Sequence, residues 1–124
     1  MLVAARPNHP GLMEIDSAAL RRRNSALPLR VFGEHTKPVF LLGSDAHHIY
    51  LRYADGTDVL SWDVREGYNM TRLISIHSPG PRLIPTSVSA DPLKHALLVL
   101  DSNYADVINT NSPAYQRISF IGQL

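Results

Sequence analysis

Hydrophobic and polar residues alternate with a period of two along much of this chain. In the stretch 59–64, Val59, Ser61 and Asp63 alternate with Leu60 and Trp62. Successive side chains of a β-strand point to opposite faces, so this period predicts strands and not helices. The run 96–100 is instead continuously apolar, and we expect a strand buried on both faces there.

Helix breakers leave little room for helices. Nine prolines and seven glycines are spread along the chain. The window 12–27 escapes them, and there Asp16 or Ser17 is a candidate N-cap. We expect a turn or one to two helical turns over Ser17–Arg23, and little helix elsewhere.

A repeated unit organises the strands. Three segments each contain a strand, a second strand that closes with an acid or an amide, and a further strand. These strands are expected at 2–6, 11–16 and 29–32 in the first copy, at 49–53, 58–63 and 72–76 in the second, and at 97–101, 105–109 and 117–120 in the third. The closing residues are Asp16, Asp63 and Asn109, at intervals of 47 and 46 residues. Further short strands are expected before the second and third copies, at 39–42 and 85–90. A unit of about 40–50 residues with four antiparallel strands is typical of a β-propeller blade. An unrelated β-sandwich is the alternative, because its strands also recur every 8–12 residues.

The sequence therefore predicts an all-β fold made of antiparallel β-propeller blades. A length of 124 residues is that of one domain. We expect a single partial propeller over residues 1–124, divided into a partial blade 1–36, a blade 37–82 and a blade 83–124. Six blades of this period need about 280 residues, so the chain is expected to be a fragment of about two and a half blades.

Several of these strand patterns resemble the Yellow/major royal jelly protein family. The matching segments are Leu2–Gly11, Asp58–Val64, Thr71–Ile76, Pro85–Asp91 and Ala96–Asp101. The resemblance implies a six-bladed propeller from a secreted parent protein. It also implies that the parent binds small aromatic amines or catechols, or acts in the melanin pathway as a dopachrome-converting isomerase. Two alternatives remain open: a structural or protein-interaction piece of a propeller without catalysis, and a six-bladed lactonase-like hydrolase.

The candidate ligand site follows the apolar strand 97–100. Asp101 is suited to pair with an amine, Asn103 to hold a hydroxyl and Tyr104 to stack on an aromatic ring. Thr86 and Ser87, on the preceding strand, are expected to add polar groups. The alternative interpretation is that Asp101 and Asn103 simply form a turn.

Composition and charge narrow the range of partners. Twelve basic and eleven acidic residues leave a net charge of +1, which favours neither nucleic acid nor an anionic membrane. The chain has no cysteine and no apolar run of membrane-spanning length. Its first residues do not read as a signal peptide, so secretion is expected only through the resemblance. Open strand edges predict self-association.

Other residue clusters have structural interpretations. His47 and His48 are adjacent and lack a metal-ligand spacing, so we predict no metal and no cofactor. Ser44, Asp45 and His47 include the residue types of a catalytic triad, but a polar turn after Gly43 explains them.

Three further features carry weaker signals. Trp62 with Asp63 is expected to pack and to cap a turn, and Arg21–Arg23 to form a solvated turn. Asn69 begins the glycosylation sequon Asn69-Met70-Thr71. The sequence lacks the glycine motifs of phosphate-binding loops and of nucleophile elbows.

Overall fold

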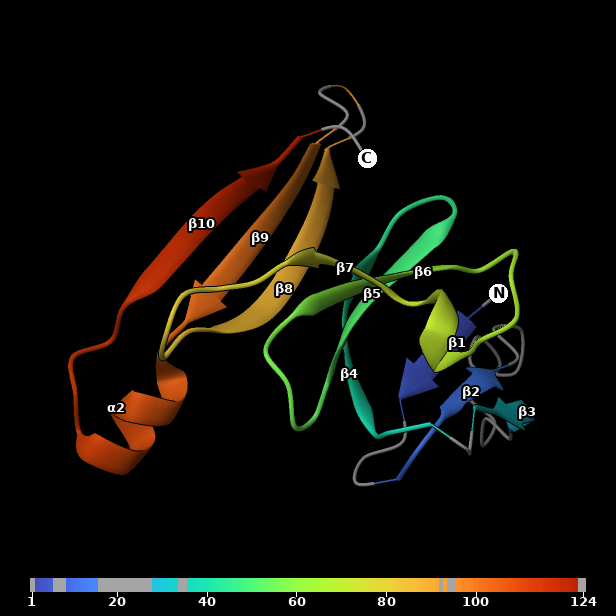
Figure 1. Ribbon diagram of the computed structural model, residues 1–124, viewed down its shortest axis with the longest axis horizontal. Coiled ribbons are helices and arrows are strands. Elements are labelled where there is room, and N and C mark those ends of the chain that lie inside the picture. The colour runs from blue at the N-terminus through green and yellow to red at the C-terminus, as the bar shows by residue number, and fades with distance from the viewer. Residues whose placement is uncertain are drawn as a thin grey trace, which may run out of the picture.

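The computed structural model describes residues 2–5, 9–15, 28–33, 36–91, 93 and 96–122, and this part of the chain is almost entirely β (Figure 1). These ranges contain ten strands, one 3₁₀ turn and one short α-helix. All strand pairs are antiparallel and form three sheets. The prediction of an all-β antiparallel fold is confirmed. Asp16 and the short helix expected at Ser17–Arg23 lie outside the described residues.

The first sheet has the strand order β1-β2-β3. Its strands are β1 (Leu2–Ala5), β2 (Leu12–Ile15) and β3 (Pro28–Phe32). Ala5 pairs with Leu12, which in turn pairs with Phe32. These three side chains belong to one apolar cluster, so one face of this sheet is directed at the rest of the molecule.

The middle sheet has four strands in chain order. They are β4 (Val39–Ser44), β5 (His48–Tyr53), β6 (Val59–Asp63) and β7 (Ile74–His77). The outer strand was expected to begin at Arg72, but residues Met70–Arg72 form a 3₁₀ turn (η1) capped by Asn69. Trp62 is buried in the core, and the Asp63 carboxylate accepts a hydrogen bond from the Arg65 backbone N–H (3.0 Å), as expected for packing and turn capping.

The third sheet has the order β8-β9-β10. Its strands are β8 (Ile84–Asp91), β9 (Ala96–Ser102) and β10 (Gln116–Ile121). The strand predicted at Ala105–Asn109 is wrong, because these residues lie in helix α2 (Tyr104–Thr110). Asn109 therefore does not close a strand as Asp63 does, and these two residues are not structurally equivalent.

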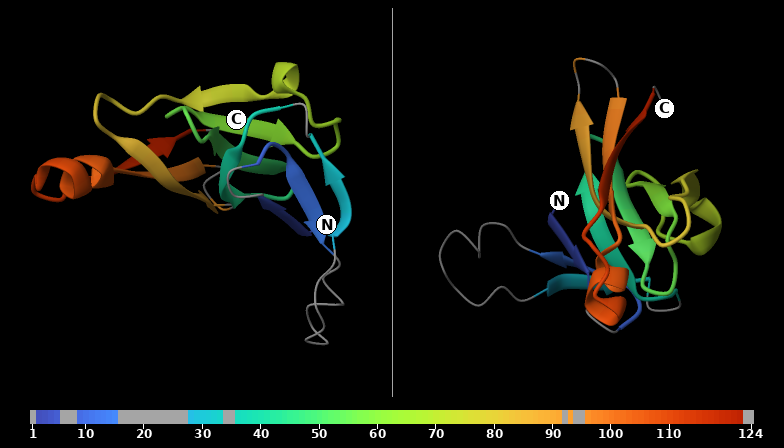
Figure 2. Two further views of the ribbon diagram at one scale, coloured as in Figure 1. Left: turned by 90° about the horizontal axis from the view of Figure 1, so that it is seen from below. Right: turned by 90° about the vertical axis from the view of Figure 1, so that its left-hand side faces the viewer.

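Local and tertiary causes both account for helix α2. Asn111, directly after the helix, has φ +55°, a left-handed conformation that commonly ends helices. Pro113 follows two residues later. Strand β10 pairs directly with β9, from Gln116 opposite Ser102 onwards, so the position beside β9 is already occupied. Figure 2 shows α2 beyond the end of the third sheet, away from the first sheet.

The middle sheet is buried on both faces because alternate side chains of its strands enter two different cores. Leu51, Leu60 and Trp62 pack towards the first sheet. Tyr50 and Val59 pack towards the third sheet. The middle sheet thus lies between the other two (Figure 1).

Strands β4 and β8 approach each other very closely at one glycine. A Cβ atom added to Gly43 would lie 1.9 Å from the backbone oxygen of Val88. Only a residue without a side chain fits between these two backbones. Gly43 thereby positions the edge of the middle sheet on the third sheet, and the turn that follows it belongs to the pocket described next.

Candidate functional site

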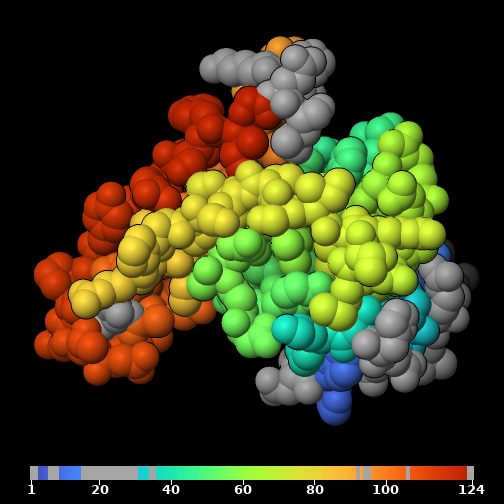
Figure 3. Space-filling view, viewed as in Figure 1, coloured from blue at the N-terminus to red at the C-terminus, as the bar shows by residue number. Residues whose placement is uncertain are grey.

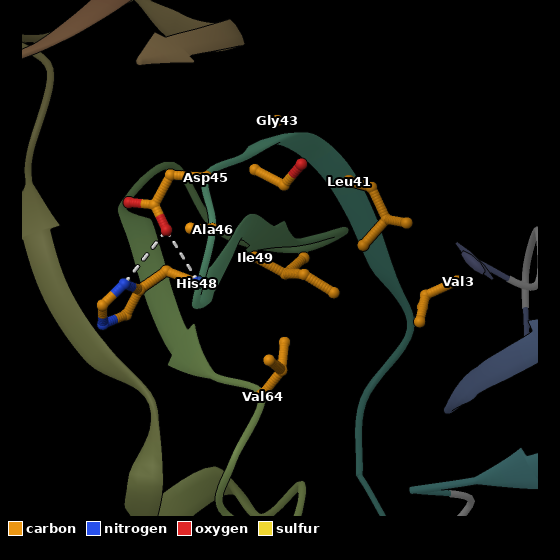
Figure 4. A pocket seen from close by; sticks show the side chains of 9 residues that line it. Val3, Leu41, Gly43, Asp45, Ala46, His48, Ile49 and Val64 are labelled. Carbon is orange, nitrogen blue, oxygen red and sulfur yellow. Dashed lines mark hydrogen bonds and ion pairs between the residues drawn. The ribbon is translucent and has the colours of Figure 1, made fainter. Parts of the chain in front are cut away.

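A pocket of about 360 Å³ opens where the first and middle sheets meet, at the turn between β4 and β5 (Figure 4). In Figure 4 the side chains of Leu41, Ile49 and Val64 border one space, and those of Asp45 and His48 lie to one side of it. The full lining consists of Val3, Leu41, Gly43, Ser44, Asp45, Ala46, His48, Ile49 and Val64. Small-molecule pockets usually span about 300–1,000 Å³ and combine apolar walls with few polar groups, as this one does.

The Asp45 carboxylate is the organising polar group of this pocket. Its Oδ1 accepts hydrogen bonds from the backbone N–H groups of His47 (2.9 Å) and His48 (2.8 Å). His48 Nδ1 lies 3.2 Å from the same oxygen, and the Tyr50 hydroxyl donates to Oδ2 (2.5 Å). These bonds fix the turn, which is the polar turn expected after Gly43.

These hydrogen bonds keep Asp45 charged. Burial raises the pKa of Asp45, but the hydrogen bonds from Tyr50, His47 and His48 outweigh burial and place the pKa below its ordinary value of 3.8. Burial, together with the adjacent carboxylate, raises the pKa of the Tyr50 hydroxyl above its ordinary range. The Asp45 side chain retains 29% exposure, so a fixed negative charge faces solvent at the rim of an apolar pocket.

We expect Tyr50→Phe to lower the free energy of unfolding by about 1–2 kcal/mol at neutral pH, because it deletes a hydrogen bond to a charged group and keeps the buried ring. A lowered pKa contributes stability above the unfolded pKa that is lost as the pH falls through the folded pKa. The difference from wild type should therefore shrink below pH 3.8. Urea denaturation of wild type and Tyr50→Phe, at neutral pH and again below pH 3.8, measures this difference in the free energy of unfolding. Tyr115→Phe, at an exposed tyrosine, is the control.

Asp101, the first predicted ligand residue, is turned into the protein. It is fully buried within β9. His77 Nε2, from the last residue of β7, lies 2.9 Å from Asp101 Oδ2. Arg117 on β10 donates to the same oxygen through Nη2 (3.3 Å). The His77 contact joins the middle sheet to the third sheet, and the Arg117 contact lies within the third sheet.

Asn103 and Tyr104 are also engaged within the fold. The Asn103 side chain donates to the Pro113 carbonyl (2.9 Å) and accepts from the Tyr115 backbone N–H (2.7 Å), which closes the loop after α2. Tyr104 accepts a hydrogen bond from Arg52 (3.3 Å). The three residues lie at one end of the third sheet but face different partners, and their ligand role stays a prediction.

The remaining predicted residues lie apart from one another. The Thr86 hydroxyl donates to the Leu100 carbonyl (3.1 Å) at a bulge in β8, and Ser87 is half-buried opposite Leu100. Asn69 is exposed, and its side-chain oxygen accepts from the Thr71 backbone N–H (3.0 Å) and hydroxyl (3.1 Å). Glycosylation of Asn69 stays a prediction.

A second pocket, of about 280 Å³, lies beside an aromatic cluster. The rings of Phe32 and Tyr68 lie 5.8 Å and 5.0 Å from the Trp62 ring, centroid to centroid. The Trp62 indole donates to the Glu66 carbonyl (3.1 Å). Because these rings mainly contact one another, we interpret the cluster as core packing between the first and middle sheets.

Metal-ligand clusters and membrane-spanning helices are both missing from the described part of the chain. Within the described ranges, no three His, Cys, Asp or Glu side chains converge as metal ligands would. None of the helices in this part of the chain has the length and apolarity needed to cross a membrane.

The pocket at Asp45 was missed as a ligand site by sequence reasoning, which recognised only its turn. A signal existed in Gly43 and Asp45, two positions apart, since a glycine forced by close packing and a turn-capping carboxylate both fix the position of a charge. The apolar wall had no local signal, because Val3 and Val64 come from distant segments. Comparisons of the chain with protein-family models, with curated proteins and with solved structures find no match.

Proposed function

We propose that this chain is a segment of a β-propeller that binds a small organic cation with an apolar body, and that the pocket at Asp45 is the binding site. Single-ring aromatic amines are the ligand class that we favour. The propeller is supported by three antiparallel sheets packed face to face and by the contact between β4 and β8, the first strands of their sheets.

The observation that carries the proposal is an anionic group at the rim of an apolar pocket. Leu41, Ile49 and Val64 offer a surface for a ring, and the Asp45 carboxylate offers a partner for an ammonium group. Its Oδ2 accepts one hydrogen bond, from Tyr50, and so retains capacity for another donor. The ligand class also agrees with the amine binding that the Yellow-like strand patterns imply.

The opposite end of the sheets suits an amine less well. Asp101 already has Arg117 at 3.3 Å, and Tyr104 has Arg52 at 3.3 Å. Both arginines carry a positive charge at all physiological pH values and would repel an ammonium group. We therefore place the amine at Asp45 and not at the residues that the sequence indicated.

We propose binding and not catalysis for Asp45. A general base works best with a pKa near the operating pH, whereas the hydrogen bonds to Asp45 lower its pKa below 3.8. Dopachrome conversion and secretion of a larger parent remain proposals that rest on the resemblance alone. A purely structural propeller piece is the outcome expected if no amine binds.

Isothermal titration calorimetry with the single-ring amines tyramine and dopamine tests the site. We expect Asp45→Asn to lower the affinity tenfold to a hundredfold, since a charge-assisted contact contributes about 1.5–3 kcal/mol. Asparagine can still accept the backbone hydrogen bonds of the turn, so the fold should be retained. The charge-matched control is Asp55→Asn, an exposed carboxylate at the other end of β5.

The ligand supplies a second control. 4-Methylphenol, which lacks the amine, should bind weakly to wild type and equally to Asp45→Asn. Equal tyramine affinity in wild type and Asp45→Asn would refute the site, and absence of binding to wild type would favour the structural interpretation.

A further inference from the structure

His48 lines the Asp45 pocket and lies beside the charge that the proposed amine would contact. Its ring Nδ1 is 3.2 Å from Asp45 Oδ1, and the ring stacks on that of Tyr50, with 6.3 Å between the centroids. Figure 4 shows the His48 ring next to the Asp45 carboxylate, and Figure 3 shows the turn between β4 and β5 at the molecular surface. The His48 side chain is 33% exposed, so it can exchange protons with solvent.

A proton taken up by His48 would change the charge of this pocket. A carboxylate only accepts hydrogen bonds, so we assign a hydrogen to Nδ1 in both charge states of the ring, and Nε2 takes up the additional proton. Histidine is the side chain whose charge ordinarily changes between pH 5 and 8. The Tyr50 hydroxyl stays neutral in that range, because burial and the Asp45 carboxylate raise its pKa.

The carboxylates around His48 keep their charges between pH 5 and 8. Asp63, on β6, pairs directly with His48, and hydrogen bonds from Arg65 hold the pKa of Asp63 below its ordinary value of 3.8. The pKa of Asp45 lies below the same value. Val3, which the first sheet contributes to the pocket, is uncharged. Among the residues that line the pocket, His48 is therefore the one whose charge changes in this range.

We propose that His48 couples amine binding at Asp45 to pH, so that the pocket holds an amine more tightly while His48 is neutral than when it is protonated. This inference rests on the amine site proposed above and adds its regulation. A protonated His48 ring at Oδ1 and an ammonium group at Oδ2 would share one carboxylate, and two positive charges so close together repel each other. Because such coupling is reciprocal, binding of an amine should expel a proton from the ring.

Calorimetric titration with tyramine at about pH 7.5 and about pH 5.5 tests the coupling. We expect wild type to bind tyramine about three- to tenfold more weakly at the lower pH, since both side chains are partly exposed and solvent screens the repulsion. The ammonium group of tyramine keeps its charge at both pH values. 4-Methylphenol carries no charge and should bind equally at both.

Two histidine variants locate the effect. His48→Gln should bind tyramine with the same affinity at both pH values, because glutamine is neutral and its side-chain amide can still donate to Asp45. His47→Gln is the matched control. His47 is exposed and does not line the pocket, so this variant should keep the pH dependence of wild type. Circular dichroism at both pH values shows whether each variant is folded.

Proton release is a second measurement, and it needs no substitution. The heat of tyramine binding is measured at about pH 6.5 in phosphate and in ACES, two buffers with different ionisation enthalpies. A proton that leaves the protein is taken up by the buffer, so the two heats differ in proportion to the protons released. We expect wild type to release a fraction of a proton for each tyramine bound, and His48→Gln to release none.

The possible failures can be told apart. Equal tyramine affinity of wild type at both pH values, without proton release, would overturn the coupling and leave the amine site in place. The same pH dependence in His48→Gln as in wild type would place the coupling on another group and would also overturn the inference. Absence of tyramine binding to wild type at about pH 7.5 would overturn the amine site and the coupling together.

Discussion

Gly43→Ala is expected to destabilise the protein by about 3 kcal/mol or more, at the upper end of the effects of overpacking. The added methyl carbon would lie 1.9 Å from the Val88 backbone oxygen and 2.9 Å from the Val88 carbonyl carbon. A flexible side chain could move away from such a contact, but here the obstacle is the backbone of β8, held in the third sheet by its pairing with β9. Relief requires β4 and β8 to separate, which opens the core around Tyr50 and Val99.

Chemical denaturation measures this loss, and other glycines provide the control. Gly56→Ala would bring its Cβ no closer than 3.5 Å to Tyr53, an ordinary contact distance. We expect Gly56→Ala to change stability by less than about 1 kcal/mol. Equal stabilities of Gly43→Ala and Gly56→Ala would contradict the close approach of the two sheets.

Trp62→Ala is expected to cost about 3–5 kcal/mol, the usual range for deleting a buried aromatic side chain. Trp62 is 3% exposed and contacts the rings of Phe32 and Tyr68. Its removal leaves a cavity between the first and middle sheets and an unpaired Glu66 carbonyl. Trp62 is the single tryptophan of the chain, so the variant has no tryptophan fluorescence, and its unfolding is followed by circular dichroism.

Trp62→Phe separates the two contributions of this side chain. Phenylalanine keeps an aromatic ring in the cluster but loses the indole N–H, so we expect a loss about half that of Trp62→Ala. A loss below about 1 kcal/mol for Trp62→Ala would mean that the first sheet does not pack on the middle sheet as described.

Strands were predictable from the sequence because their signal is local. Leu60 and Trp62 lie two positions apart and both pack towards the first sheet, which is the period of two that predicts a strand. The strand expected at Ala105–Asn109 failed because β-branched Val107 and Ile108 favour a strand locally. The left-handed Asn111 and the direct pairing of β10 with β9 determine a helix instead. The pairing of β10 with β9 is a tertiary effect, and the residue pattern of one segment does not contain it.

The candidate site was less predictable because it depends on contacts between distant segments. Asp101 has the sequence context of an exposed turn, yet His77 and Arg117 hold it inside the protein. Asp45 was correctly interpreted as part of a turn, but its pocket also needs Val3 and Val64, which line it from two distant segments. A charge that ends a strand can be located from sequence, whereas the surface opposite it cannot.

Amine binding at Asp45 is tested most directly by ¹⁵N NMR of the assigned protein titrated with tyramine. The proposed site predicts the largest chemical-shift changes at the backbone amides of Asp45, His48 and Val64, and much smaller changes in Asp45→Asn at the same tyramine concentration. Changes centred instead on Asn103 and Tyr104, at the other end of the sheets, would contradict it.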